Sequence, residues 1–138
     1  MTIRKIAQIG HPVLRQRARE VSLDELRSGE MQRFVDDLVE TMRDANGAGL
    51  AAIQVYEPIR IVAIEVGDNP RYPYKPRIPL TVVVNPVIEP IPGPDGEHEF
   101  VEINEGCLSV PNMRGNVMRH VYIRVRYLDR HGVEHDEI

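Results

Sequence analysis

One amphipathic helix, followed by a change to strand-like patterns, most constrains how this chain can fold. From about Glu30 to Ala45, apolar residues recur at spacings of three and four while charged residues occupy the opposite face. The apolar set is Met31, Phe34, Val35, Leu38, Val39 and Met42. This period predicts a helix with one buried face, and Asn46-Gly47 is typical of a helix end.

Beyond the helix, the chain changes to strand-like runs separated by segments rich in proline and glycine. Such runs occupy residues 60–66, 80–84, 87–88 and 121–128. The first is nearly continuously apolar and predicts a buried strand, and the last alternates and predicts a half-exposed one. Pro86 separates the middle two. Residues 67–80 hold four prolines and predict a long loop.

Shorter signals complete the prediction of the fold class. Ser22 followed by Glu25 is a capping box, so a short helix is expected there. GPDG at Gly93–Gly96 and DRHG at Asp129–Gly132 predict turns, and a returning strand is expected after the second. A helix followed by several strands predicts an α+β fold with mainly antiparallel sheets packed around helices. The length of 138 residues fits one domain, residues 1–138.

Composition excludes several classes of protein. Apolar residues make up 42% of the chain, which argues against global disorder. A net charge of −4 argues against general nucleic-acid binding, whose electrostatic footprint is basic. The single cysteine excludes an internal disulfide. Neither a membrane-spanning run nor a secretory signal is recognisable, so we expect a soluble cytoplasmic protein.

The eight residues from Gly47 to Gln54 (GAGLAAIQ) leave the backbone almost bare. They include two glycines and three alanines, which let another group approach the chain closely. Gln54 adds an amide that can donate a hydrogen bond to an oxygen. A helix end followed by a tightly packed strand of small residues is the alternative interpretation. A phosphate loop is excluded, because the segment lacks the GK[ST] ending and follows a helix.

Cys107 lies in the segment EGCLSVP, between an acidic residue and a proline. A lone cysteine is most often a small buried hydrophobic residue. A nucleophile would need a base nearby, and a metal ligand would need companion ligands. The flanking Gly106 and Glu105 are not typical of a core strand, so these alternatives stay open on the segment alone.

Taken together, the two segments resemble the first two signature motifs of the peptide deformylases. The lead-in GHPVLRQRA and the amphipathic helix before GAGLAAIQ resemble the same family. The resemblance covers essentially the whole chain, from about Ile3 to Ile138. It implies hydrolysis of the formyl group from the N-terminal formylmethionine of new polypeptides. Formylmethionyl nascent peptides, and the ribosome that presents them, are the partners it implies, with no membrane and no nucleic acid.

The resemblance also implies a divalent metal, natively iron (Fe(II)), which nickel, cobalt or zinc can replace. Cys107 matches the thiolate ligand. Gln54 and the backbone N–H of Leu108 match the two donors to the formyl oxygen as it becomes an oxyanion. These roles agree with the chemistry, since a metal lowers the pKa of bound water to about 7 and an oxyanion needs fixed donors.

Five further residues match positions of the family that bind the substrate. Gly49 and Leu50, with Gly47 before them, resemble the strand edge on which the peptide lies as an added strand. Glu105 and Arg114 match positions near the mouth of the site. A purely structural ion pair between Glu105 and Arg114 is the alternative.

The chain departs from the family at its third motif, HExxH, which is absent from these 138 residues. Cys107 alone cannot hold a catalytic metal, which usually has three protein ligands. His131 and His135 fit the inverted pattern HxxEH, but that pattern needs a helix. In an extended segment the two histidines lie about 13 Å apart. We therefore expect a domain truncated at its C-terminus relative to the family, with an exposed apolar groove.

Three functions remain in competition at this stage. The first is a metal-dependent deformylase, at least in the complete protein. The second is a non-catalytic, deformylase-like remnant that binds peptide ends or a protein partner. A cysteine hydrolase using Cys107 is the third, and it is the weakest because no histidine lies in a motif-like context.

Overall fold

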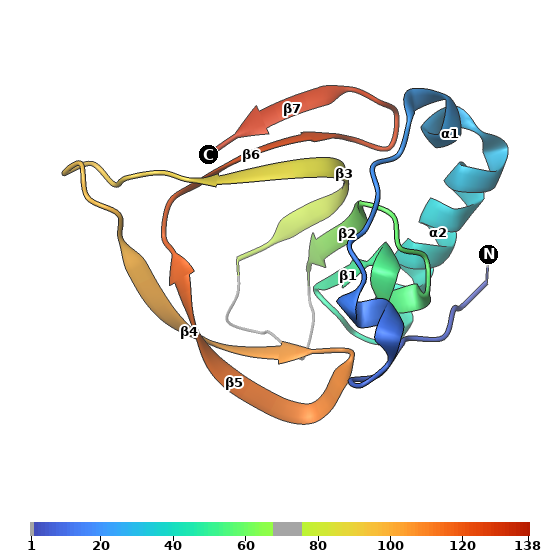
Figure 1. Cartoon of the computed structure of the whole chain (residues 1–138), viewed down its shortest axis with the longest axis horizontal. Helices are drawn as coiled ribbons and strands as arrows, with labels where there is room; N and C mark the ends of the chain where they lie inside the picture. The colour runs from blue at the N-terminus through green and yellow to red at the C-terminus, as the bar shows by residue number, and fades with distance from the viewer. Residues whose placement is uncertain (1, 68–75) are drawn as a thin grey trace.

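The computed structural model describes residues 2–67 and 76–138 and shows an α+β fold, as predicted (Figure 1). The helices are the 3₁₀ turns η1 (Pro12–Arg15) and η2 (Ala52–Val55) and the α-helices α1 (Leu23–Arg27) and α2 (Gly29–Asp44). The strands are β1 (Gly49–Ala51), β2 (Ile61–Val66), β3 (Ile78–Pro90), β4 (Phe100–Cys107), β5 (Val110–His120), β6 (Ile123–Leu128) and β7 (Glu134–Glu137).

Helix α2 forms as its apolar period predicts. The Ser22–Glu25 capping box starts α1, and the Ser28 hydroxyl caps α2 by accepting from the Met31 N–H at 3.1 Å. Asn46 ends the helix in the left-handed conformation, with a φ of 55°. The predicted face is buried at Phe34, Val35, Leu38, Val39 and Met42, whereas Met31 is only half-buried.

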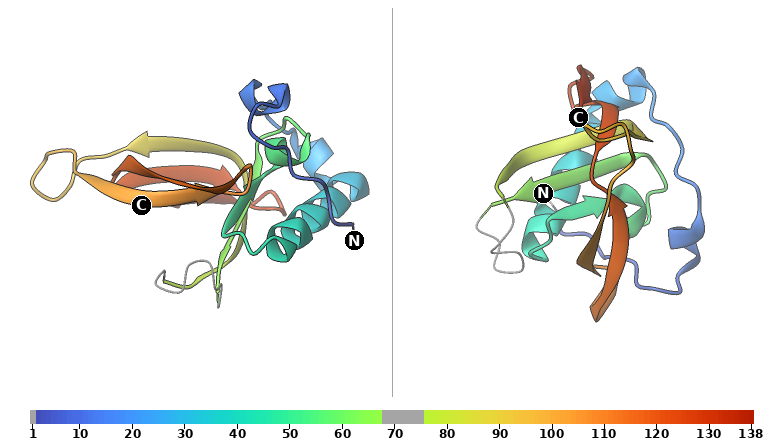
Figure 2. Two further views of the ribbon diagram at one scale, coloured as in Figure 1. Left: turned by 90° about the horizontal axis from the view of Figure 1, so that it is seen from below. Right: turned by 90° about the vertical axis from the view of Figure 1, so that its left-hand side faces the viewer.

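The described strands form two antiparallel sheets. The larger has the order β1-β2-β3-β6-β7, and the smaller is the β4–β5 ribbon. The core lies between α2 and the first three strands of the larger sheet, where Leu50, Ile61 and Val84 are buried. Figures 1 and 2 show the ribbon on the side of the molecule away from α2. None of the described helices is long and apolar enough to cross a membrane.

Strand β3 is longer than the sequence predicts. Residues 80–84 and 87–88, expected as two runs separated by Pro86, belong to one strand with a register shift between Val84 and Val87. Asn85 sits at the shift with a φ of 51°, and its side chain bonds to both the N–H and the carbonyl of Val21. The irregularity thus accommodates Pro86 without ending the strand.

The prediction of a loop at residues 67–80 is wrong for its last three residues, because β3 begins at Ile78. Residues 68–75 of that prediction lie outside the described residues. Both predicted turns are confirmed, since Gly96 N–H bonds to Gly93 and Gly132 N–H bonds to Asp129 at 3.0 Å each. The strand expected after the second turn is β7.

Neither β4 nor β5 was predicted as a strand, and the sequence of β5 lacks an apolar alternation. The residues of β5 pair with β4 from Phe100↔His120 to Cys107↔Val110, and most of them are exposed. Large apolar side chains are exposed on this ribbon at Phe100, Val101, Met113 and Met118. These side chains do not by themselves form the apolar groove expected from the missing third motif, and that groove stays a prediction.

Candidate active site

The two motif segments meet at the tip of the β4–β5 ribbon. Gln54 lies in η2, directly after β1, and Cys107 ends β4. Leu108 and Ser109 form the turn into β5. The Gln54 amide Nε2 lies 3.7 Å from Cys107 Sγ and donates to Ser109 Oγ at 3.0 Å. The fold therefore places an amide donor beside an exposed thiol, from segments far apart in the chain.

Local helix chemistry orients the Gln54 side chain. Gln54 is the third residue of η2, and its Oε1 accepts from the backbone N–H of Ala51 at 3.0 Å. This is the half of a capping box in which the side chain reaches back to the residue before the helix. The amide nitrogen consequently faces away from Ala51, toward Ser109 and Cys107.

Leu108 packs into a space that only glycine leaves open. A Cβ added at Gly47 would lie 2.6 Å from Leu108 Cδ1. Leu108 in turn packs against the core cluster of α2 and the larger sheet. The small residue at position 47 thus lets the tip of the ribbon seat against the end of α2, which is the close approach expected from GAGLAAIQ.

Strand β1 presents a free edge near these residues. Among the described strands it pairs only with β2, with Gly49 opposite Ile64 and Leu50 opposite Ala63. Leu50 is buried, and a Cβ on Gly49 would meet nothing closer than the Ala63 carbonyl at 3.7 Å. An extended peptide can therefore add to β1 as a further strand.

Glu105 and Arg114 lie on the ribbon, on opposite strands. Glu105 accepts two bonds from the Arg119 guanidinium, at 2.8 and 2.7 Å. Arg114 donates to the side chain and the carbonyl of Asn104, at 2.6 and 3.0 Å. The sequence did not single out Arg119 and Asn104 as partners, because their proximity depends on the register between β4 and β5.

The donors in the described residues do not fit a metal ion on their own. Within residues 2–67 and 76–138, no three His, Cys, Asp or Glu side chains gather as a metal would require. The HxxEH interpretation is wrong, because residues 131–135 form a turn and the start of β7 rather than a helix. His135 bonds instead to Asp129 at 2.9 Å and stacks on Tyr127. Cys107 contributes a single donor.

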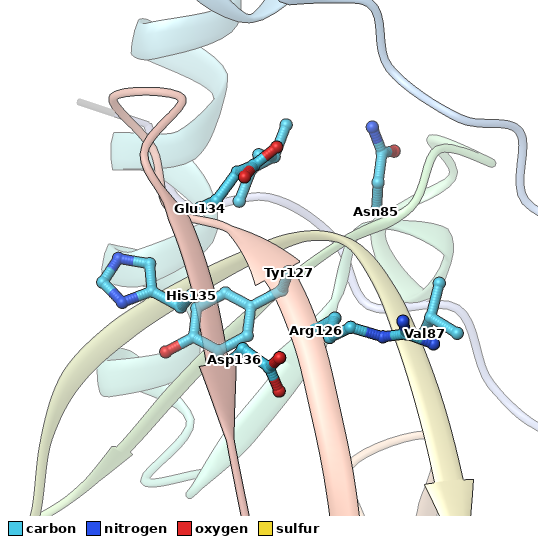
Figure 3. A pocket seen from close by; sticks show the side chains of 8 residues that line it. Asn85, Val87, Arg126, Tyr127, Glu134, His135 and Asp136 are labelled. Carbon is cyan, nitrogen blue, oxygen red and sulfur yellow. The ribbon is translucent and has the colours of Figure 1, made fainter.

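A cavity of about 530 Å³ lies elsewhere, over β3, β6 and β7. Figure 3 shows Arg126, Glu134, His135 and Asp136 around it. None of the residues in GAGLAAIQ or EGCLSVP lines it, and Asp136 is paired with Arg124 at 2.5 Å. Size alone therefore does not make this cavity the better candidate for the chemistry.

Sequence reasoning missed Ser109 and the contacts of Ala7 and Ile9, which precede GHPVLRQRA. Ser109 is 3% exposed, and its carbonyl accepts from the Ile9 N–H at 2.8 Å. The Gln54 carbonyl accepts from the Ala7 N–H at 2.7 Å. A serine inside the apolar run CLSV was the only local sign that its hydroxyl has a buried partner.

Comparison with known proteins decides the family. A family model described as polypeptide deformylase matches residues 3–138. The chain belongs to the peptide deformylase family. A peptide deformylase of Leptospira biflexa is 44% identical over 140 residues, covering 100% of this chain and 75% of that protein. Peptide deformylase 2 of a Nostoc species is 42% identical over 127 residues, covering 92% of this chain and 67% of that protein.

Solved structures show the same fold. The crystal structure of a class I type b peptide deformylase from Acinetobacter baumannii, bound to Met-Ala-Ser, superposes with a TM-score of 0.89 at 36% identity. The match covers 98% of this chain and 82% of that one. The family resemblance and the α+β fold inferred from the sequence are therefore confirmed.

Proposed function

We propose that this chain supplies the peptide-binding strand, the oxyanion donors and one metal ligand of a metal-dependent deformylase. The reaction is hydrolysis of the formyl group of N-terminal formylmethionine on nascent polypeptides, with release of formate. The observation that carries the proposal is the contact of the Gln54 amide with Cys107 Sγ at 3.7 Å, next to the free edge of β1.

The substrate would lie along β1 as an added antiparallel strand. Gly49 and Leu50 would bond to its backbone, and Gly47 would keep the approach open. Glu105 and Arg114, on the ribbon, would border the same opening. The exposed position of Gly49 and the free edge support this arrangement. It would bring the formyl group to the start of η2, where Gln54 projects.

Two donors would then stabilise the negative charge that develops on the formyl oxygen. One is Gln54 Nε2, whose orientation is held by Ala51 and Ser109. The other is the backbone N–H of Leu108, in the turn that follows Cys107. A preorganised donor of this kind contributes about 3 kcal/mol to the transition state.

The metal requires ligands beyond those described here. We propose iron(II), with nickel, cobalt or zinc as substitutes, held by the Cys107 thiolate together with ligands from outside these 138 residues. When bound, such a metal lowers the pKa of water enough to supply a nucleophile at neutral pH. Reading the coding region past codon 138 tests this source of ligands, because an in-frame HExxH supports it and its absence contradicts it.

The setting proposed for this reaction is the cytoplasm, with nascent peptides emerging from the ribosome as substrates. The net charge of −4 supports a peptide partner over nucleic acid. The Met-Ala-Ser complex of the Acinetobacter relative supports recognition of methionine-led peptides. A second candidate is a peptide-binding protein without catalysis, which the lack of a metal-binding cluster among the described residues favours.

Formate release from formyl-Met-Ala-Ser by the nickel-loaded protein, expressed with the in-frame residues that follow codon 138, distinguishes these candidates. For the deformylase we expect release that disappears in Cys107→Ala and falls about 10²- to 10³-fold in Gln54→Ala. Thr41→Val, which removes a buried hydroxyl that bonds to Arg4 and Asp37 and to no residue of the site, should retain the wild-type rate. If no formate is released but Met-Ala-Ser binds, the non-catalytic alternative is supported, and failure of both contradicts both functions.

A further inference from the structure

We propose that Ser109 is a positioning residue that aims the Gln54 amide, an inference that rests on the proposed function. The Ser109 side chain is 3% exposed, and its Oγ accepts from Gln54 Nε2 at 3.0 Å. Ser109 would not touch the substrate itself. It would act by fixing the direction in which Gln54 presents its remaining N–H.

The Gln54 amide is held at both ends. Its oxygen accepts from the Ala51 N–H at 3.0 Å, and its nitrogen donates to Ser109 at 3.0 Å. The Ala51 contact excludes the flipped amide, because a flip would set NH₂ against a backbone N–H. That contact alone would still let the NH₂ end swing about the oxygen. The bond to Ser109 prevents this swing and so fixes the plane of the amide.

One amide hydrogen remains after these two bonds are made. An NH₂ group has two donors in the plane of the amide, and Ser109 takes one of them. The second has Cys107 Sγ as its neighbour, 3.7 Å from Nε2. Its direction follows from the amide plane, so Ser109 determines where the oxyanion donor points relative to the thiol.

Ser109 is itself fixed relative to Gln54 by Ala7 and Ile9, near the N-terminus. The Ala7 N–H donates to the Gln54 carbonyl at 2.7 Å, and the Ile9 N–H donates to the Ser109 carbonyl at 2.8 Å. Two residues of one short segment, Ala7 and Ile9, thus hold the backbones of both partners. The 3.0 Å side-chain bond is consequently built on a backbone frame that does not depend on the exposed part of the ribbon.

A buried serine could instead do no more than satisfy its own hydroxyl. Both roles make Ser109→Ala less stable, since loss of a buried hydrogen bond costs stability anywhere in the chain. Only a positioning role also changes the environment of the Gln54 amide and the turnover rate. The matched control is Thr41→Val, because Thr41 is equally buried and bonds to Arg4 N–H and the Asp37 carbonyl, away from Gln54.

Side-chain amide NMR of the ¹⁵N-labelled chain tests the inference without any catalysis. The Gln54 resonances are identified by their loss in Gln54→Ala. Gln32, whose amide donates to the Leu26 and Arg130 carbonyls, serves as the internal reference. We expect Ser109→Ala to move the Gln54 pair and leave Gln32 unchanged, with Thr41→Val moving neither. Ser109→Thr, which keeps the hydroxyl, should restore the Gln54 pair. An unmoved Gln54 pair in folded Ser109→Ala overturns the proposal.

Kinetics adds a second readout. We expect Ser109→Ala to lower kcat about tenfold with little change in KM, and Ser109→Thr to recover most of the loss. An unchanged kcat in Ser109→Ala overturns the positioning role even if the resonances move. If the wild-type protein, expressed with the in-frame residues that follow codon 138, releases no formate, the proposed function is refuted instead. The NMR comparison still decides whether Ser109 holds Gln54.

Discussion

The helix-backed sheet and the β4–β5 ribbon both contribute to the candidate site, yet they are stabilised in different ways. In the first region, α2 covers β1, β2 and β3, and Val35, Leu38 and Ile61 are completely buried. In the ribbon, no residue of either strand is buried. Its buried side chain is Ser109, in the turn. The packed core therefore positions Gln54, whereas Cys107 is positioned by the turn at the tip of the ribbon.

This difference means that the two motifs depend on different interactions. The position of Gln54 depends on the packing of β1 and η2 against the core. Cys107 depends on the seating of the ribbon tip, through Leu108 against Gly47 and Ser109 against Gln54 and Ile9. Regions with few buried contacts open at low free energy, so the ribbon strands should exchange amide hydrogens faster than α2.

The largest difference is expected between core and ribbon truncations. Leu38→Ala should lower the free energy of unfolding by about 2 to 5 kcal/mol, because it leaves a cavity in a packed interior. Met118→Ala on the ribbon, where the side chain is 61% exposed, should cost no more than about 0.5 kcal/mol. Urea unfolding measures both, and similar losses would contradict the contrast between the two regions.

Substitutions at two glycines test how the turn at the tip of the ribbon packs against Gly47. Gly47→Ala should cost about 1 to 3 kcal/mol, because its new Cβ would lie 2.6 Å from Leu108 Cδ1 and push the turn outward. Gly49→Ala is the control, since its Cβ meets the Ala63 carbonyl at an ordinary 3.7 Å. We expect it to be neutral within about 0.5 kcal/mol. Urea unfolding gives both values, and equal effects would argue against the contact with Leu108.

Acid should lower the stability of the helix-backed sheet through protonation of Asp37, which lies on α2. The Thr2 N–H, and then the Arg4 guanidinium, lower the pKa of Asp37 below its usual 3.8. A lowered folded-state pKa gives stability that is present above the unfolded pKa and is lost as the pH falls through the folded value. Asp37→Asn should therefore cost about 1 kcal/mol at pH 7 and progressively less below about pH 4.

Unfolding by urea between pH 7 and pH 2 measures this effect. Glu97→Gln, an exposed substitution in the loop before β4, is the control and should follow the wild-type curve throughout. If the free energies of unfolding of Asp37→Asn and the wild type differed by a constant amount across this range, the contacts with Thr2 and Arg4 would not depend on ionisation of the carboxylate.

The smallest effect is expected for the ion pair on the ribbon. The side chains of Glu105 and Arg119 are 31% and 54% exposed, so water and salt screen their attraction. Glu105→Gln should change the free energy of unfolding by less than about 1 kcal/mol, and the difference should shrink further in 1 M salt. A larger, salt-independent loss would mean that the ribbon relies on this pair for its shape.

The sequence predicted the elements whose signals are local. The period of α2, the Ser22–Glu25 capping box and both turns depend on neighbours within a few residues, and all of them formed as expected. Strands β4 and β5 and the continuity of β3 were missed. The two strands depend on pairing with each other, and the continuity of β3 depends on the irregularity at Asn85, which no local pattern specifies.

The candidate site divides in the same way. The residue types alone marked Gln54 as an amide donor and Cys107 as the single thiol, because those chemistries belong to the side chains themselves. The contact of Gln54 with Ser109, the pairing of Glu105 with Arg119 and the free edge of β1 were decided only by the tertiary structure. Each depends on strand order, register or packing between distant segments, which local sequence cannot encode.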